Sequence, residues 1–433
     1  MSFLPDLWPL TKIQVQIYND PSRFIWCSAG RRSRKTLLFS RKLLLNAIKT
    51  PGHYFQAAPV ENQAVRIFWE NPYNHLKENT RPIWTKPPNE SRHIVYIRSG
   101  PGGRSESQIH VFGVKNPSRI DGSPWSGCHV TEIDECSEST WSQHVRIVMG
   151  DTGGFAYLDG VPEMGRGWYY RECLHAAGGA LPQRNEELKG SFASSGKGHV
   201  YYHWKSSDVL SAAEIEDLKR TLDPVIYRLE MEGSFESMLT AAYYQFGAHN
   251  LDPTIQYNPF LPVRIGMDFN VNPMTATFSH YVQGVIMQFG EAYLPHSNTP
   301  GMIKYIKNLF PVNMCIIYPD STGGNKTANA DLSSIALLKK AGFKVQAPKQ
   351  NPEVKDRLNT VNASLKNMAG EVRYKINPET CPKTIDGFNT TERKEDGTIE
   401  KDKPDKLGHN ITDAAGYCVC RLIPIARGAV YSL

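Results

Sequence analysis

The chain has 433 residues, more than one ordinary hydrophobic core accommodates, so two domains are expected. Its hydrophobic content of 40% and aromatic content of 10% exclude an intrinsically disordered chain. The formal net charge of +6 is compatible with a polyanionic partner. The eight cysteines lack paired zinc spacing, and we expect them to be free thiols in a reducing compartment. Because no apolar run is long enough to cross a membrane, we expect a soluble intracellular protein.

The first informative segment, Arg23–Leu38, is an apolar run that ends in a Gly- and Arg-rich turn, followed by Lys-Thr and a helical apolar pattern. This order is typical of a strand, a phosphate-binding loop and a helix, with backbone N–H groups gathered around an anion. The usual pattern G-x-x-x-x-G-K-[ST] has Ala29 and Arg34 in place of its two glycines. The alternative is a basic strand-to-helix turn that binds no ligand. Strands and helices alternate beyond this point, which predicts a mostly parallel sheet.

The residues of this loop have distinct expected roles. The Lys35 ammonium would neutralise phosphate charge, and the Thr36 hydroxyl would reach Mg²⁺. One loop arginine would act as an arginine finger, or the arginines pair with surface carboxylates. Gln14 is a candidate for reading the adenine edge; Gln16 competes for that role, and an ordinary surface glutamine is the alternative. The candidate nucleotide-binding set is Gln14, Gly30, Arg31, Arg32, Ser33, Arg34, Lys35, Thr36 and Asp134.

A second motif is a strand predicted to end in the acidic pair Asp134 and Glu135. Asp134 would hold Mg²⁺, often through water, and Glu135 would polarise the attacking water. The strand is less apolar than usual because His129, Thr131 and Glu132 interrupt it. The alternative is a buried strand that ends in a solvated acidic turn.

Two segments that follow the acidic pair carry further predictions. Leu158–Trp168 is a predicted strand end and a Gly-rich turn, which senses the γ-phosphate or is an ordinary turn. Ser211–Glu232 is predicted to be one amphipathic helix, with Ser211 and Glu214 forming a capping box at its start.

The Pro-rich segment Leu251–Pro262 marks the expected domain boundary. We therefore expect an α/β protein with a nucleotide-binding domain over residues 1–250 and a second domain over residues 251–433. Residues from about 205 to 250 are expected to form a helical linker within the first domain.

Three aspartates of the second half occupy positions that favour a metal site. Asp268 and Asp320 each end a predicted apolar strand, and Asp413 lies near the start of a predicted helix. Carboxylate oxygens suit Mg²⁺ or Mn²⁺, and two such ions about 3.5–4 Å apart cleave phosphodiesters. Glu291, in a further predicted strand, is a candidate fourth ligand or a solvated strand-edge residue. Any single aspartate of this kind is more often a turn former or a cap, so the ordered set carries the prediction.

Taken together, the chain resembles the large terminase subunit of tailed double-stranded DNA bacteriophages, over nearly its whole length. In that family an N-terminal ATPase moves DNA into an empty capsid, and a C-terminal RNase H-like nuclease cuts the concatemer. Two departures are Arg34, where the family usually has Gly, and Val161, where it has a hydroxyl residue. The resemblance rests on Gly30–Thr36, Asn116–Gly122, Ile133–Glu135, Gly160–Pro162 and the order Asp268, Asp320, Asp413 with His409 before the last.

The resemblance implies a P-loop (RecA/ASCE-like) ATPase domain followed by an RNase H-like nuclease domain, acting together as a viral DNA-packaging motor. The implied cofactors are ATP and Mg²⁺, with Mn²⁺ as an alternative ion at the nuclease site. The implied partners are double-stranded DNA, the portal protein of the procapsid, the small terminase subunit and further copies of the chain in a ring, without a membrane. The implied location is the cytoplasm of the infected bacterial host. The alternative is a helicase-like or recombination ATPase whose second domain binds DNA without cutting it.

Basic residues of the second half form a candidate surface for contacts with DNA phosphates, the alternative being a solvated helix surface. The mixed-charge segment Thr391–Lys406 is predicted to be an exposed loop or hairpin that controls access to the metals. The basic candidates are Lys339, Lys340, Lys344, Lys349, Lys355, Arg357 and Lys366.

Overall fold

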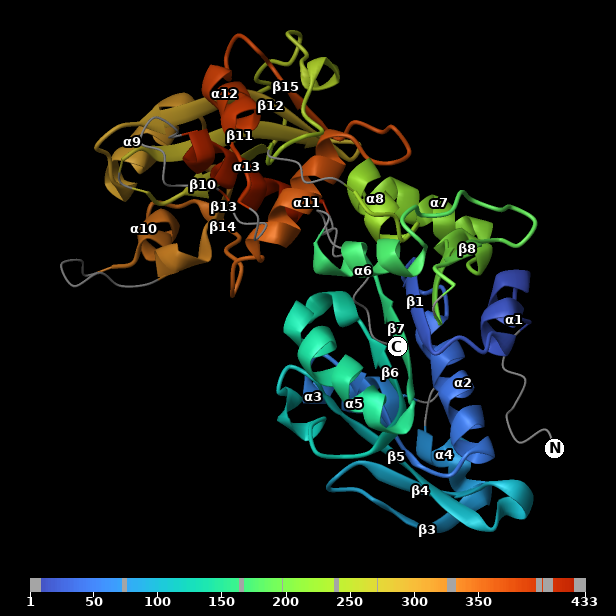
Figure 1. The fold of residues 1–433 in the computed structure, drawn as a ribbon. Helices are drawn as coiled ribbons and strands as arrows, with labels where there is room; N and C mark the ends of the chain where they lie inside the picture. Colours follow the sequence, from blue (N-terminus) through green and yellow to red (C-terminus); the bar gives the residue numbers. More distant parts are fainter. Residues whose placement is uncertain are drawn as a thin grey trace. The chain divides into compact units, whose positions relative to one another are not determined.

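The structure is a computed structural model that describes residues 9–71, 76–162, 167–196, 198–236, 241–270, 272–324, 332–394, 399 and 408–423. Within these residues the chain forms two compact units (Figure 1). The first holds residues 9–215 and 228–236, and the second holds residues 216–227 and those from 241 onward. Among the described residues, none of the helices has the length and apolar character that crossing a bilayer requires.

The first unit contains a nine-stranded sheet, counted within the described residues. Its strands are β1 Phe24–Ala29, β2 His53–Ala58, β3 Trp84–Asn89, β4 Ile94–Ser99, β5 Ser105–Gly113, β6 Trp125–Thr131, β7 Phe155–Gly160, β8 Ser191–Ser194 and β9 His199–Trp204. Their order is β3-β4-β5-β2-β6-β7-β1-β9-β8. The strands from β5 to β9 in this order are parallel, and both edges are antiparallel. The expected mostly parallel sheet is confirmed, and the carboxyl ends of β6, β7 and β1 are adjacent.

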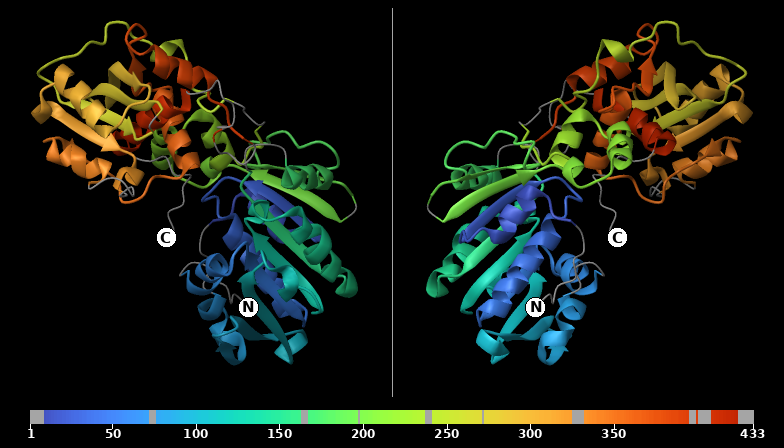
Figure 2. Two further views of the ribbon diagram at one scale, coloured as in Figure 1. Left: turned by 90° about the vertical axis from the view of Figure 1, so that its left-hand side faces the viewer. Right: turned by 90° about the vertical axis from the view of Figure 1, so that its right-hand side faces the viewer.

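Helices cover both faces of this sheet (Figure 2). They are α1 Lys12–Asn19, α2 Lys35–Lys49, α3 Glu61–Ala64, α4 Leu76–Thr80, α5 Arg146–Thr152 and α6 Trp168–Ala176, with π-helical turns at Val65–Glu70 and Thr140–Val145. Alternate side chains of β1 enter different cores: Ile25 and Cys27 pack with α1 and α2, whereas Phe24 and Trp26 pack with α5 and α6. Because β1 is buried on both faces, its apolar run has no polar alternation.

The single helix predicted between Ser211 and Glu232 is wrong at its centre. The structure has two helices there, α7 Ala212–Thr221 and α8 Pro224–Glu230, because Pro224 begins a new helix instead of continuing the first. The predicted capping box is confirmed, since the Glu214 N–H donates to Ser211 Oγ and the Ser211 N–H donates to the Glu214 carboxylate. The chain passes from the first unit to the second within α7 and returns within α8.

The second unit contains a six-stranded sheet within the described residues, ordered β14-β13-β10-β11-β12-β15. Its strands are β10 Val263–Asp268, β11 Met274–Val282, β12 Val285–Leu294, β13 Cys315–Pro319, β14 Lys344–Val345 and β15 Tyr374–Ile376. Strands β10, β11 and β12 form an antiparallel meander, and β13 and β14 extend the sheet in parallel from β10. This arrangement agrees with the α/β fold expected from the sequence.

The helices of the second unit are α9 Thr299–Leu309, α10 Ser334–Lys340, α11 Val354–Leu365, α12 Pro382–Thr390 and α13 Gly408–Leu422. Helix α13 lies very close to β10, because a Cβ at Gly266 would meet the Ala414 carbonyl oxygen at 2.0 Å. It also lies close to α11, because a Cβ at Gly416 would meet the Arg357 side chain at 2.8 Å. These two glycines therefore allow α13 to bring its N-terminal half to the end of β10.

One buried acid at the start of α8 gives a prediction about stability. Asp223 is 1% exposed, and its Oδ1 accepts hydrogen bonds from the N–H groups of Val225 and Ile226 and from the Tyr244 hydroxyl. Burial raises the pKa of Asp223 to about 6. Because the folded-state pKa exceeds that of the unfolded chain, the charged form costs stability as pH rises from about 4 to 6, by about 3 kcal/mol in full.

Asp223→Asn keeps the acceptor oxygen and removes the charge, so the variant should gain melting temperature relative to wild type between pH 4 and pH 7. Differential scanning fluorimetry over this range measures the difference. An offset between the two proteins that stays constant across the range would contradict the prediction.

Candidate functional site

The predicted phosphate loop connects the buried strand β1 to helix α2, which begins at Lys35. Arg32 and Arg34 have φ angles of 62° and 65°, in the left-handed region that favours glycine. A side chain with a Cβ costs about 1 kcal/mol there. The missing glycine before Lys35 therefore leaves the backbone in a glycine-like conformation, at the cost of strain in the loop.

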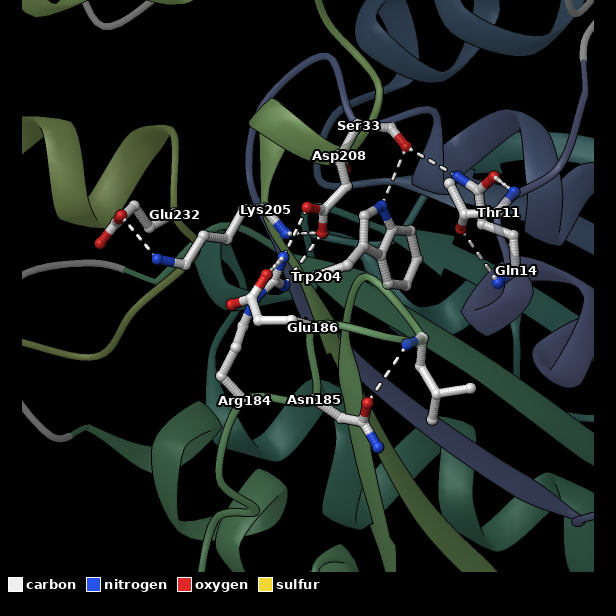
Figure 3. A network of polar contacts seen from close by, with 11 residues as sticks. Thr11, Gln14, Ser33, Arg184, Asn185, Glu186, Trp204, Lys205, Asp208 and Glu232 are labelled. Atoms are coloured by element: carbon white, nitrogen blue, oxygen red, sulfur yellow. Dashed lines mark hydrogen bonds and ion pairs between the residues drawn. The ribbon is translucent and has the colours of Figure 1, made fainter.

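Two side chains from outside the loop hold the Ser33 carbonyl (Figure 3). Gln14 Nε2 donates to it over 3.2 Å, and Trp204 Nε1 donates over 3.0 Å. Gln14 is completely buried, and its Oε1 accepts from the Thr11 N–H. The expected contact of Gln14 with an adenine edge therefore does not fit this structure, in which the buried amide supports the loop.

The end of α8 and the residues after it form a second support of the loop. The Glu230 carbonyl accepts a hydrogen bond from the Arg31 N–H at 2.6 Å, and the Glu230 carboxylate accepts one from the Arg31 guanidinium. A Cβ at Gly30 would meet the Met231 carbonyl oxygen at 2.1 Å, so glycine is required at this close approach. Arg31 is thus engaged within the unit, whereas the side chains of Arg32 and Arg34 are exposed.

The Lys35 side chain is nearly buried and lies 3.7 Å from Glu132 Oε1. Strand β6 ends at Thr131, and Glu132 follows with a φ of 51°. The prediction that this strand extends to the acidic pair is therefore wrong, because the left-handed residue ends the ladder. Asp134 and Glu135 lie instead in a 3₁₀ turn, with Glu135 exposed.

The hydroxyl of Thr36 also contacts the end of β6, where it lies 3.0 Å from the hydroxyl of Thr131. Sequence reasoning missed Thr131 and Glu132 as site residues. Their signal was present, because both are polar residues at the end of an otherwise buried strand. Asp134 lies against the end of β7, where a Cβ at Gly160 would meet its Oδ1 at 2.1 Å. Within the predicted turn after β7, residues 163–166 lie outside the described part of the chain.

In the second unit, the three predicted aspartates come together at one edge of the sheet. Asp268 ends β10, Asp320 directly follows the neighbouring strand β13, and Asp413 lies on α13. They are 5%, 8% and 5% exposed. Burial, together with the negative charges of Asp413 and Asp320, raises the pKa of Asp268 to about 7. Burial and the two neighbouring carboxylates therefore favour the protonated form of Asp268.

Each of the three carboxylates is contacted by a polar or cationic side chain. Asn270 donates to Asp268 over 2.5 Å, Asn351 donates to Asp320, and Arg357 Nη2 donates to Asp413 over 2.6 Å. Among the described residues, no three His, Cys, Asp or Glu side chains are spaced to hold a metal ion. The chemistry of the carboxylate donors fits a hard divalent cation.

Two residues proposed from sequence have other roles in this structure. Glu291 accepts hydrogen bonds from the N–H groups of Lys383 and Thr384, so it caps helix α12 and does not join the aspartates. Arg357 is 4% exposed and paired with Asp413, so it is not part of a surface that contacts DNA. The side chain of His409 and most of the segment 391–406 lie outside the described residues.

The fold resembles solved structures of a phage protein over nearly its full length. The large terminase from the thermophilic bacteriophage D6E matches with a TM-score of 0.58 and 18% sequence identity, covering 96% of this chain and 99% of that chain. The same terminase in complex with ATP-gamma-S matches with a TM-score of 0.54 and 19% identity, covering 95% and 99% of the two chains. No protein-family model and no curated protein sequence match this chain. The chain therefore has the two-part fold of the phage large terminases.

Proposed function

We propose that the chain is a DNA-packaging motor, in which ATP hydrolysis moves double-stranded DNA into a procapsid and a metal-dependent nuclease cuts the concatemeric genome. The observation that carries this proposal is the full-length terminase fold with a polar centre in each unit. One centre lies at the loop between β1 and α2, and the other is formed by Asp268, Asp320 and Asp413.

The charges around the loop support an ATP site. The Lys35 ammonium is buried, and its partner among the described residues, Glu132, lies beyond hydrogen-bonding distance. Within the same described part, Glu132 Oε2 is buried without a hydrogen-bond partner. Phosphate oxygens would satisfy the ammonium, and the Thr36 hydroxyl would serve a cation bound with the nucleotide. A complex with ATP-gamma-S is known for the terminase of phage D6E.

We assign the polarisation of the attacking water to Glu132. It is the acid that lies nearest to Lys35 at the end of β6, whereas Glu135 is exposed in the following 3₁₀ turn. Asp134 lies against the end of β7 and remains the proposed ligand of the nucleotide-bound Mg²⁺, as the sequence predicts. Arg32 or Arg34 is the proposed arginine finger, because the side chains of both are exposed at the loop.

The aspartate cluster supports a nuclease centre. Asp268, Asp320 and Asp413 would hold Mg²⁺ or Mn²⁺, which activates water and stabilises the leaving oxygen when bound. Arg357 holds Asp413 in place, and the two asparagines hold the other carboxylates. The positions of the three aspartates on β10, directly after β13 and on α13 hold the buried carboxylates at one edge of the sheet.

The proposed partners are double-stranded DNA, the portal protein, the small terminase subunit and other copies of the chain in a ring, in the cytoplasm of an infected bacterium. DNA phosphates would meet exposed lysines of the second unit, without sequence readout. These are Lys339, Lys340, Lys344, Lys349 and Lys355.

The assignment of Glu132 gives a prediction for ATP hydrolysis. Lys35→Ala should abolish DNA-stimulated ATPase activity, and Glu132→Gln should lower kcat by at least about 100-fold, the scale of general base catalysis. Glu135→Gln is the matched control, with an expected change of less than about threefold. Phosphate release measures all three. A large loss in Glu135→Gln with a near-normal Glu132→Gln would reverse the assignment.

The nuclease prediction separates the two centres. Asp320→Ala should lower Mn²⁺-dependent cleavage of plasmid DNA by at least about 100-fold while ATPase activity is retained. Lys35→Ala should show the converse, with normal cleavage. Gel electrophoresis of the plasmid measures nicked and linear products. Cleavage by Asp320→Ala at the wild-type rate would contradict the proposed metal centre. Wild-type protein that binds plasmid DNA without cutting it would favour the helicase-like alternative.

A further inference from the structure

A buried chain of polar side chains leads from the start of α2 into the sheet of the first unit. The Thr36 hydroxyl lies 3.0 Å from that of Thr131, and Thr131 Oγ1 donates to Asp159 Oδ1 over 3.0 Å. Asp159 Oδ2 lies 2.6 Å from His129 Nε2. Thr131, Asp159 and His129 are all 0% exposed, so these three side chains are shielded from water.

The geometry of two elements places these groups in line. Thr131 of β6 is paired in register with Asp159 of β7, and His129 lies two residues earlier on the same face of β6. Helix α2 covers this face, with Thr36 at Thr131 and the Phe39 ring 5.7 Å from the His129 ring. The contact between loop helix and sheet is therefore polar at its first turn and aromatic at its second.

The hydrogen bonds from Thr36 to Thr131 and from Thr131 to Asp159 both run in one direction, from donor to acceptor toward the Asp159 carboxylate. A hydroxyl has a single proton, and that of Thr131 is donated to the Asp159 carboxylate. The Thr131 oxygen can then only accept in its contact with Thr36, so the Thr36 hydroxyl is the donor. The lone pairs of the Thr36 oxygen consequently point away from Thr131.

His129 is the last residue in this series of hydrogen-bonded side chains. Its Nδ1 is buried and has no hydrogen-bond partner among the residues that the structure describes. Aromatic rings of Phe39 and Phe68 lie within 6 Å of its ring, at 5.7 and 5.4 Å. A proton on Nδ1 would be an unsatisfied buried donor, so Nε2 is the ring nitrogen that carries a proton and donates it to Asp159. Asp159 is thereby kept as an acceptor on both oxygens.

We propose that Asp159 and Thr131 are positioning residues that set the proton of Thr36, so that the Thr36 oxygen presents lone pairs to a divalent cation bound with the nucleotide. This inference rests on the proposed nucleotide site. It assigns a role to the polar residues that interrupt β6, and it extends the site to β7. Without the carboxylate, Thr131 could donate to Thr36 and turn the Thr36 proton outward, where it would repel the cation.

The test compares ADP binding with Mg²⁺ and with EDTA, by isothermal titration calorimetry on the full chain. Thr131→Val preserves the shape of the side chain and removes the acceptor for Thr36. It should reduce the gain in ADP affinity that Mg²⁺ provides by about three- to tenfold, the scale of one hydrogen bond. Affinity in EDTA should stay unchanged, and Thr131→Ser should restore the gain.

A second variant tests Asp159 without leaving a buried orphan. The double substitution His129→Leu with Asp159→Leu replaces both partners by apolar groups, which is the less disruptive change in a core. It should show the same selective loss. An equal fall in affinity with Mg²⁺ and with EDTA, or a normal Mg²⁺ gain in the variants, would overturn the inference. If wild type binds no ADP under either condition, the nucleotide site itself fails, which is a separate outcome.

Discussion

The first unit depends on one constraint, which is that its phosphate loop has a glycine-like backbone built from non-glycine residues. Arg32 and Arg34 occupy the left-handed region, and such residues persist only when their surroundings determine the conformation. The surroundings here come from distant parts of the chain. Gln14 and Trp204 hold one carbonyl of the loop, and Glu230 holds the N–H and guanidinium of Arg31. Contacts from residues outside the loop therefore determine its backbone conformation.

This dependence links the loop to the path of the chain. The chain enters the second unit within α7 and returns within α8. Glu230 then contacts Arg31 of the loop, and Met231 and Gly233 lie against Gly30 at its start. Phosphates that bind the loop would compete with the Glu230 carbonyl for the Arg31 N–H. A change in that contact would act directly on α8, which is covalently continuous with the second unit. The proposed motor would thus need no long pathway between the nucleotide and the connection of its two parts.

The sequence predicted features that depend on local pattern and missed those that depend on a partner. The strand, loop and helix around Lys35 and the order of the three aspartates follow from apolar runs that end in characteristic residues. The end of β6 was misplaced because it is set by the left-handed conformation of Glu132, and neighbouring residues in sequence do not reveal this conformation. Glu291 and Gln14 have the residue types expected of ligands. Their actual partners, a helix end for Glu291 and a loop carbonyl for Gln14, come from segments of the same chain that are distant in sequence.

The same dependence on partners from distant segments governs the second centre. Buried carboxylates need such partners, since an unpaired charge costs several kcal/mol in an interior. Arg357 meets this need for Asp413 by donating to Oδ1, and its own guanidinium stacks on the Tyr417 ring at 4.9 Å. Oδ2 of Asp413 is then the atom by which it would bind a cation. Arg357 therefore orients the Asp413 carboxylate, and a bound cation would offset the burial and the neighbouring negative charges that raise the pKa of Asp268.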